Sequence, residues 1–208
     1  MTDEPILTLP ADEARLLQDH YARADVVLEY GSGGSTLLAA RLGKQVFSVE
    51  SDAAWAQSLS GHIAQNGFQS LVRLIHVDVG PVGKWGKPKD KQALGAWHCY
   101  PLQVWDRDDF QHPDVILVDG RLRAACLVTA ILRAQKPVTV LFDDYANRAQ
   151  YHVVERILKP TEIVGRMARF DVTPNMDVAQ HLTWMIGTFT QMQLATLPRW
   201  DVRRYLRR

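Results

Sequence analysis

Short apolar runs and amphipathic stretches alternate along most of this chain. The apolar runs, rich in Val, Ile and Leu, occur in DVVLEY, QVFSVE, SLVRLIHVD, PDVILVDG and PVTVLFDDY. Between them lie stretches with helical spacing of apolar positions, such as STLLAARLG, SDAAWAQSLSGHIAQNG and RAACLVTAILRAQ. Strands and helices in strict rotation require crossover connections. The pattern therefore predicts an α/β fold in which helices cover both faces of a parallel sheet.

The two ends of this pattern add elements of their own. Residues 10–24 combine an acidic first turn with apolar positions at helical spacing, so a leading helix is expected. Ser51 is expected to cap the helix after the second strand, and Asn66-Gly67 to end it. Near the other terminus, EIVGRMARFDVT and HLTWMIGTF follow each other with only a loop between them. These two segments are predicted to form an antiparallel strand pair that closes the sheet.

Length and composition are those of an ordinary globular protein. The 208 residues, 47% hydrophobic and 23% charged, fit a single domain over residues 1–208. The formal net charge of +1 gives no general reason to expect nucleic-acid or membrane binding, although a basic tail occupies residues 190–208. No apolar run has the length of a membrane span, and the two cysteines lack zinc-site spacing. We expect a cytoplasmic protein, and the tail leaves room for a homo-oligomer.

One long segment interrupts the alternation. Residues 80–113, GPVGKWGKPKDKQALGAWHCYPLQVWDRDDFQHP, form an irregular connection of a length that is uncommon in compact domains. Its aromatic residues need surfaces to pack on, which argues against disorder. The segment is predicted to form a partly helical cap over the open end of the sheet and to shape a pocket there. Packing on the scaffold without contact to a ligand is the alternative for each aromatic residue.

A glycine cluster follows the first predicted strand, where open α/β sheets bind their ligands. Gly31, Gly33 and Gly34 permit close approach of the backbone to a ligand, while Ser35 and Thr36 open the next helix with unpaired amides. The second strand ends in Glu50, at the spacing where a carboxylate accepts hydrogen bonds from ribose hydroxyls. The pattern predicts a site for a nucleoside cofactor.

Two classes of nucleoside cofactor use such a loop, and the neighbouring residues distinguish them. A dinucleotide-binding loop reads G-x-G-x-x-G, whereas Thr36 stands at the sixth position here. Glu29 precedes the loop at the end of the first strand, where a pyrophosphate gains nothing from negative charge. A cofactor with a cationic centre and an amino group would gain from it. These features favour a sulfonium nucleoside over NAD(P).

The pattern LEYGSGG followed by SVE resembles motif I and the ribose-binding acid of class I S-adenosylmethionine-dependent methyltransferases. The resemblance covers residues 26–189. It implies a three-layer Rossmann-like fold with a seven-stranded, mostly parallel sheet whose last strand is antiparallel. It also implies that Glu50 holds the ribose, that two glycines border the methionine moiety, and that Asp78 lies near the adenine. The residues expected to bind the cofactor are Glu29, Gly31, Ser32, Gly33, Gly34, Ser35, Thr36, Glu50, Ser51, Asp78 and Asp119.

Three carboxylates follow the fourth and fifth predicted strands, at the same edge of the sheet as the loop. They are Asp119 in VILVDG and Asp143 and Asp144 in VLFDDY. Their placement resembles metal-dependent O-methyltransferases of the catechol and macrocin types, which implies Mg²⁺ ligands at all three positions and a catalytic role for Asp119 and Asp143. Arg121 and Arg123 depart from the catechol-type pattern and offer ion pairs in place of a metal. A third alternative is that Asp144 caps a helix.

The acceptor of the methyl group is expected to be a hydroxyl of a small molecule, because the D/N-P-P-Y/F signature of amino-group methyltransferases is absent. Two other functions remain open at this point. One is an NAD(P)-dependent oxidoreductase, which the missing third glycine and Glu29 disfavour. The other is a methyltransferase-like protein that binds a nucleoside or a partner without catalysis.

Overall fold

A computed structural model describes residues 3–190 of the chain. A seven-stranded sheet with the order β3-β2-β1-β4-β5-β7-β6 forms its centre. Strands β1 to β5 are parallel to one another, and β7 runs antiparallel to both β5 and β6. This confirms the predicted fold class. The strands are β1 (Val26–Tyr30), β2 (Gln45–Glu50), β3 (Val72–His76), β4 (Val115–Val118), β5 (Val138–Phe142), β6 (Glu162–Val164) and β7 (Met167–Val172).

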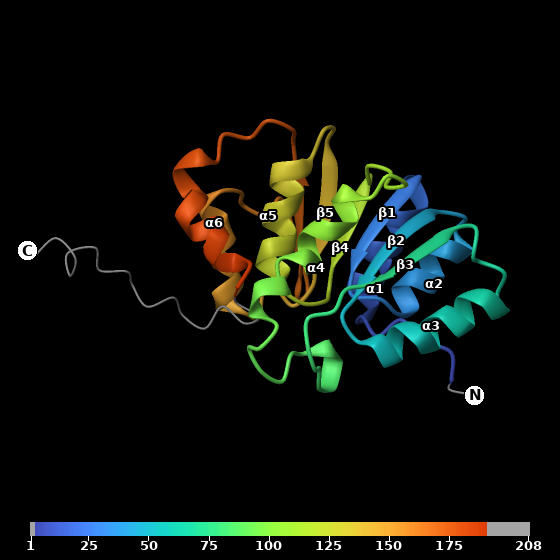
Figure 1. Cartoon of the computed structure of the whole chain (residues 1–208). Coiled ribbons are helices and arrows are strands. Elements are labelled where there is room, and N and C mark those ends of the chain that lie inside the picture. Colours follow the sequence, from blue (N-terminus) through green and yellow to red (C-terminus); the bar gives the residue numbers. More distant parts are fainter. Residues whose placement is uncertain (1–2, 191–208) are drawn as a thin grey trace, which may run out of the picture.

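Helices cover both faces of this sheet, which makes a three-layer structure (Figure 1). Alternate residues of β1 belong to different cores: Leu28 and Tyr30 pack on one face and Val27 on the other. Such alternation buries every position of the strand and explains why the strands read as continuous apolar runs. On one face lie α1 (Ala11–Arg23), α2 (Gly34–Arg41) and α3 (Ala53–Gln65), and on the other α4 (Cys99–Leu102), α5 (Arg123–Arg133) and α6 (Leu182–Thr188).

Of the two segments predicted to form the last strand pair, only EIVGRMARFDVT forms strands, so the prediction for HLTWMIGTF is wrong. The antiparallel hairpin β6–β7 forms entirely within EIVGRMARFDVT, where Gly165 takes the left-handed conformation with φ +54° in the turn. The segment HLTWMIGTF forms the end of a 3-10 turn and then helix α6, with Met185 buried against the core and Ile186 exposed. A short apolar run fits a helix face as well as a strand, and here the sheet edge is already occupied by β6.

The helix punctuation of α3 is confirmed at one end only. Asp52, not Ser51, caps the helix, because its side chain accepts hydrogen bonds from the amides of Ala54 and Trp55. Gly67 follows the helix in the left-handed conformation, as expected for a C-terminal stop. The correction leaves Ser51 free for another role at the end of β2.

The segment of residues 80–113 forms short helical turns around α4, as expected for a partly helical segment. Trp97, Tyr100 and Trp105 are buried in the core on the α5 side of the sheet. Trp85 differs, since 75% of its surface is exposed and its backbone lies in the left-handed region at φ +63°. Three of the aromatic residues in this segment thus anchor it, and Trp85 stands out from the surface.

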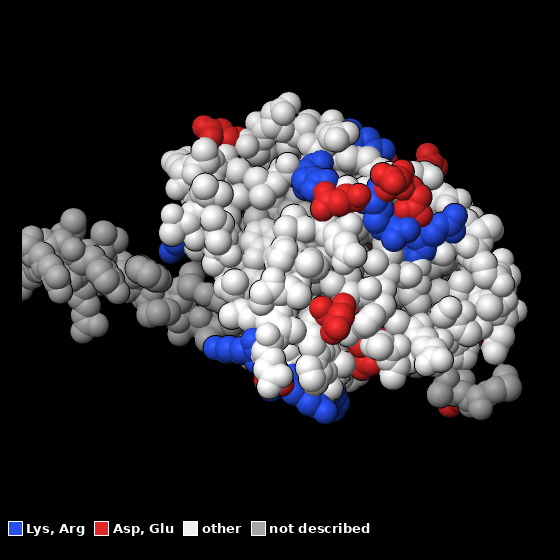
Figure 2. All heavy atoms as spheres, viewed as in Figure 1, with Lys and Arg blue, Asp and Glu red and all other residues white. Residues whose placement is uncertain are grey.

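Opposite charges lie close together on the surface. Arg107 is paired with Asp109 and Arg133 with Asp106, and the blue and red groups on the front face of the molecule lie beside one another (Figure 2). This arrangement agrees with the small net charge. Among residues 3–190, none of the helices has the length and apolar character of a membrane span. Most of the predicted basic tail, residues 191–208, lies outside the described residues.

Candidate functional site

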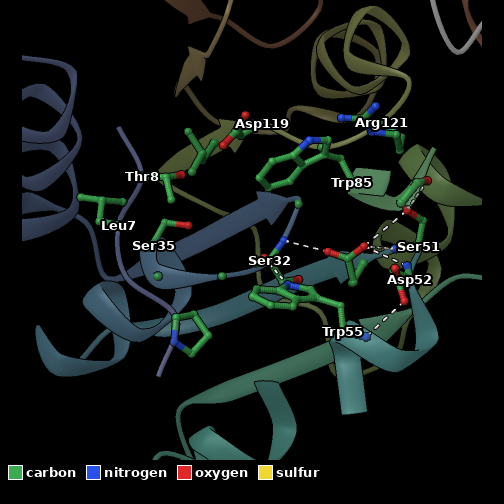
Figure 3. A pocket seen from close by; sticks show the side chains of 18 of the residues that line it. Leu7, Thr8, Ser32, Ser35, Ser51, Asp52, Trp55, Trp85, Asp119 and Arg121 are labelled. Atoms are coloured by element: carbon green, nitrogen blue, oxygen red, sulfur yellow. Dashed lines mark hydrogen bonds between the residues drawn. The ribbon is translucent and has the colours of Figure 1, made fainter. Parts of the chain in front are cut away.

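A cavity of about 540 Å³ opens at the carboxyl ends of the central strands. Ligand pockets of small-molecule enzymes have volumes in this range. Figure 3 shows Trp85 on one side of the cavity and Trp55 on the other, with Leu7, Thr8 and Ser35 at one end and Ser51 and Asp52 at the other. The lining residues are 4–9, 31–35, 50–52, Trp55, Trp85, Gly86, Tyr100, Leu117 and 119–121. The cavity therefore brings the glycine loop, the end of β2 and the end of β4 together.

Glycine is required at two positions of the loop for steric reasons. Gly31 has φ +99°, and a Cβ atom there would lie 2.7 Å from the backbone nitrogen of Gly120. A Cβ atom on Gly34 would overlap the backbone of Ile6 and Leu7, which cross the start of α2. Gly33, by contrast, has open space toward the cavity, with Trp55 as its nearest neighbour at 3.9 Å. The loop is thus pressed against the end of β4 on one side and is open to the cavity beside it.

The carboxylate of Glu50 is held at the cavity wall by backbone amides. Its Oε1 atom accepts hydrogen bonds from Ser51 N at 2.6 Å and Asp52 N at 2.9 Å, and its Oε2 atom accepts one from Ser32 N at 3.2 Å. These contacts connect the end of β2 with the glycine loop (Figure 3). A carboxylate fixed in this way has a set orientation and keeps lone pairs for a ligand.

Glu29 lies beneath the loop rather than in the cavity. It is fully buried, and its carboxylate accepts hydrogen bonds from Tyr21 at 2.7 Å, Thr36 at 2.5 Å and Ser48 at 3.1 Å. Burial raises the pKa of Glu29, and these hydroxyl donors oppose the rise. The expectation of a direct cofactor contact is corrected for Glu29 and also for Thr36, which is fully buried as its partner. Both residues support the loop from below.

The remaining predicted cofactor residues divide between the cavity wall and its surroundings. Ser32, Ser35 and Ser51 line the cavity, and the Ser51 hydroxyl donates to the carbonyl of Gly86 at 3.1 Å. Asp78 does not line it, because its carboxylate turns back to accept a hydrogen bond from Gly80 N at 2.8 Å. The geometry thus unites the loop with the end of β2 and leaves Asp78 outside the cavity.

Sequence reasoning missed part of the wall. The N-terminal residues 4–9 cross the start of α2 and line the cavity, although nothing in their sequence marks a binding segment. Trp55 also lines it, and its indole donates to the carbonyl of Ser32 at 2.8 Å. Trp55 lies three residues after Asp52, the cap of α3, and this place in the first turn after the end of β2 was the available signal. Trp85 belongs to the segment of residues 80–113, for which a cap and a pocket were predicted as a whole.

The predicted acidic cluster exists, and arginines surround it. One oxygen from each of Asp119, Asp143 and Asp144 lies within 4.8 Å of the others. Arg166 binds Asp143 through two parallel hydrogen bonds of 2.8 and 3.0 Å. Arg123, which is buried, bonds Asp119 at 2.9 Å and pairs with Asp144 at 3.1 Å. The cluster is thus ion-paired from more than one side.

A third arginine brings the number of guanidinium groups paired with the three carboxylates to three. Arg148 pairs with Asp144 at 2.6 Å, so the carboxylates of the triad face the guanidinium groups of Arg123, Arg148 and Arg166. A Mg²⁺ ion would have to displace these partners to reach three carboxylates, because it prefers an octahedral set of oxygen ligands. The donor set matches the ion-pair alternative better than the Mg²⁺ alternative. The backbone of Asp144 is left-handed, with φ +57°, so the residue does not take the extended conformation typical of a helix cap.

Asp119 is the member of the triad that reaches the cavity. Asp143 is fully buried and does not line it, which corrects the expectation that Asp143 acts directly on a substrate. Burial raises the pKa of Asp119 to about 7, the nearby Asp143 and Asp144 add to the rise, and Arg123 opposes it. A carboxyl group at the cavity wall that titrates near neutral pH is suited to proton transfer.

The strand order, the glycine loop at the end of β1 and the acid at the end of β2 define a class I S-adenosylmethionine-dependent methyltransferase fold. The chain belongs to this superfamily. A methyltransferase-like protein from Silicibacter pomeroyi is 43% identical to it, with a TM-score of 0.84, over 90% of this chain and 98% of that one. No protein-family model matches the sequence, and no curated protein matches it.

More distant structures share the fold alone. The O-methyltransferase TomG from Streptomyces achromogenes, in complex with SAM, is 17% identical with a TM-score of 0.56, over 81% of this chain and 82% of that chain. An O-methyltransferase from Bacillus cereus, in complex with SAH, is 16% identical with a TM-score of 0.54, over 79% of this chain and 84% of that chain. The fold of this chain is thus the fold of proteins that hold the sulfur nucleoside.

Proposed function

We propose that the protein is an S-adenosylmethionine-dependent methyltransferase that methylates a hydroxyl of a small molecule. The observation that carries the proposal is the Glu50 carboxylate, fixed by the amides of Ser32, Ser51 and Asp52 at the wall of the cavity beside the glycine loop. A carboxylate in this place accepts two hydrogen bonds from ribose hydroxyls. Glu50 would hold the ribose of the cofactor, and Gly31 and Gly33 would border its methionine moiety.

The cavity also fits the other parts of such a ligand. Its volume of about 540 Å³ suits one nucleoside with an amino-acid tail, and the two indole rings on its sides are surfaces on which a flat base stacks. The exposed and left-handed Trp85 has a local conformational cost that no burial offsets. Contact with a ligand would provide that compensation. S-adenosylmethionine, when bound, supplies an electrophilic methyl group on a sulfonium sulfur.

Asp119 is the residue that we assign to proton transfer. Methylation of a hydroxyl releases a proton, and a carboxyl group whose pKa is raised to about 7 by burial is partly ionised at neutral pH. Its Oδ1 atom accepts a hydrogen bond from Arg123 at 2.9 Å, which fixes the carboxylate at the end of β4. Arg123 and Asp143 would then position Asp119 and would not meet the substrate. Alignment of acceptor and donor within the cavity would supply a further part of the rate enhancement.

The oxygen acceptor is the finer part of the proposal. It is supported by the Asp-Gly-Arg sequence after β4, which differs from the signature of amino-group methyltransferases. It is also supported by the O-methyltransferases among the structures that share the fold. An NAD(P)-dependent oxidoreductase has less support, because the third glycine of the dinucleotide loop is replaced by the buried Thr36. A binding protein without catalysis would leave the raised pKa of Asp119 without a use.

Magnesium is not part of the proposed site. Because Arg123, Arg148 and Arg166 already pair with the acidic triad, we expect no specific Mg²⁺ binding. The midpoint of thermal unfolding should be the same in MgCl₂ and in NaCl of equal ionic strength. A saturable increase with Mg²⁺ that the Asp143→Asn variant lacks would instead establish the metal site that was predicted from the sequence.

The test of the cofactor assignment is the affinity for S-adenosylhomocysteine, measured by isothermal titration calorimetry. Glu50→Gln should weaken binding at least about tenfold, because a charged acceptor of two hydrogen bonds is lost. Glu162→Gln is the matched control, since Glu162 lies on the edge strand β6 and does not line the cavity. Equal affinity of wild type and Glu50→Gln, with both proteins folded by circular dichroism, would refute the assignment.

A further inference from the structure

The arginines around the acidic triad carry one positive charge more than the triad can neutralise. Within residues 3–190, Arg123, Arg148 and Arg166 form ion pairs with Asp119, Asp143 or Asp144. Arg121 lies beside this cluster and forms no ion pair among the described residues. The triad is thus balanced by three arginines, and the fourth guanidinium has no carboxylate of its own.

The position of Arg121 is fixed by its backbone. Its amide donates to the hydroxyl of Tyr100 at 3.3 Å, and its carbonyl accepts from the thiol of Cys126 at 3.4 Å. The next residue, Leu122, is buried and has the left-handed φ of +49°. These contacts anchor the turn between β4 and α5, so Arg121 has a defined place rather than that of a flexible surface side chain.

Arg121 faces the ligand cavity and lacks polar contacts for its side chain. It lines the cavity on the same side as Asp119 and Trp85 (Figure 3). Its Nε atom is buried and has no hydrogen-bond partner within the described part of the chain. A buried donor without an acceptor is costly, and a charged one more so. A structure that keeps such a group at the wall of a cavity has a use for an anion there.

We propose that Arg121 binds a carboxylate of the ligand in this cavity. The planar fork of a guanidinium matches a carboxylate with two parallel hydrogen bonds. A singly charged group fits best, because one unmatched guanidinium faces a cavity that already contains Glu50, Asp52 and Asp119, which would repel a doubly charged phosphate. The proposal rests on the proposed function for the identity of the ligand. The carboxylate belongs either to the amino-acid end of the cofactor or to the acceptor.

The first experiment separates these two sources. Calorimetry measures the affinity of wild type and Arg121→Met for S-adenosylhomocysteine and for 5′-methylthioadenosine, a thioether of the same nucleoside without the amino acid. If the cofactor supplies the carboxylate, Arg121→Met weakens S-adenosylhomocysteine binding at least about tenfold and leaves methylthioadenosine binding unchanged. Arg107→Met is the control, because Arg107 is on the surface and does not line the cavity. Equal weakening of both ligands would overturn the proposal, since the amino acid would then be irrelevant.

If neither ligand depends on Arg121, the acceptor is the remaining source. Benzoate and its neutral isostere benzamide are then compared as probes of the protein loaded with S-adenosylhomocysteine, by saturation-transfer NMR competition. The proposal predicts a preference for benzoate in wild type that Arg121→Met loses. No such preference, or the same preference in both proteins, would overturn it. A wild type that binds neither nucleoside would refute the proposed function instead, and the comparison of benzoate with benzamide on the free protein would still test Arg121.

Discussion

Asp119 combines access to the cavity with a carboxyl group that releases its proton near neutral pH. Both properties come from its place after the last residue of β4, where the strand ends and the cavity begins. Asp143 occupies the corresponding place after β5, but it is paired with Arg166 and Arg123 and does not line the cavity. Two acids in equivalent positions of parallel strands thus have different environments, and of the two only Asp119 lines the cavity.

The raised pKa of Asp119 predicts a pH dependence of stability. The folded-state pKa of about 7 lies above the ordinary value of 3.8, so the folded protein binds this proton more tightly than the unfolded chain. The stabilisation is complete below about pH 4 and is lost as the pH rises through 7. The unfolding free energy of wild type minus that of Asp119→Asn, measured by urea denaturation, should therefore fall as the pH rises from 4 to 7. A difference that is constant over this range would contradict the assignment.

At the level of single residues, the sequence predicted which side chains end the strands but not which of them a ligand can reach. Glu50 is the last residue of β2 and Glu29 the penultimate residue of β1, yet Glu29 points toward α1, where Tyr21 donates a hydrogen bond to it. The helical spacing that places Tyr21 on the buried face of α1 was visible in the sequence. Its pairing with Glu29 was not, because it depends on how α1 packs on the sheet. The same holds for Arg166, which reaches Asp143 from the turn between β6 and β7.

Among the elements, the N-terminal residues 3–9 contribute to the cavity although they form neither a helix nor a strand. They cross the start of α2, where Gly34 leaves space for the backbone of Ile6 and Leu7, and they form one wall of the cavity. The side chain of Arg41 in α2 pairs with Glu4 and holds the segment from its other side. The shape of the cavity therefore depends on how residues 3–9 pack on α2.

Gly34→Ala should displace this segment. The added Cβ atom would overlap the backbone of Ile6 and Leu7, so we expect a loss of roughly 1–3 kcal/mol in unfolding free energy and weaker binding of S-adenosylhomocysteine. Gly61→Ala in α3 is the matched control, because a Cβ atom there has no neighbour within 4 Å. That change should stabilise the protein by roughly 0.5–1 kcal/mol through helix propensity. Chemical denaturation measures both. A Gly34→Ala variant as stable as Gly61→Ala would show that the N-terminal segment does not rest on α2.

The elements that the sequence predicted well are those with a strong period. The five parallel strands and α1, α3 and α5 were predicted because buried strands read as apolar runs and these helices repeat apolar residues at helical spacing. The strand predicted for HLTWMIGTF was wrong because its short apolar run suits a helix as well as a strand. Only the position of β6 at the edge of the sheet decides between the two. The path of residues 80–113 was beyond prediction, since buried aromatic residues rather than a period determine it.

In the whole molecule, the cavity lies where the order of the strands reverses. From β1 the chain moves outward to β2 and β3, then returns across β1 to β4 and β5. The connections on either side of β1 therefore leave in opposite directions and open a crevice at the carboxyl ends of the strands. Because this crevice follows from topology alone, its place was predictable from the alternation of strands and helices. The side chains that line it, among them Glu50, Asp119 and Arg121, do not follow from the topology.

Which nucleoside the protein binds is the most informative test of the cofactor assignment. Thermal unfolding of the intact protein is followed with S-adenosylmethionine, S-adenosylhomocysteine, NAD and NADP, each at several concentrations. Both sulfur nucleosides should raise the unfolding midpoint, with a gain of about 2.7 kcal/mol at a concentration of 100 times Kd, which corresponds to roughly 5–11 °C for a chain of this size. The two dinucleotides should leave it unchanged. A rise with NAD or NADP and none with either sulfur nucleoside would contradict the proposal that the protein uses S-adenosylmethionine.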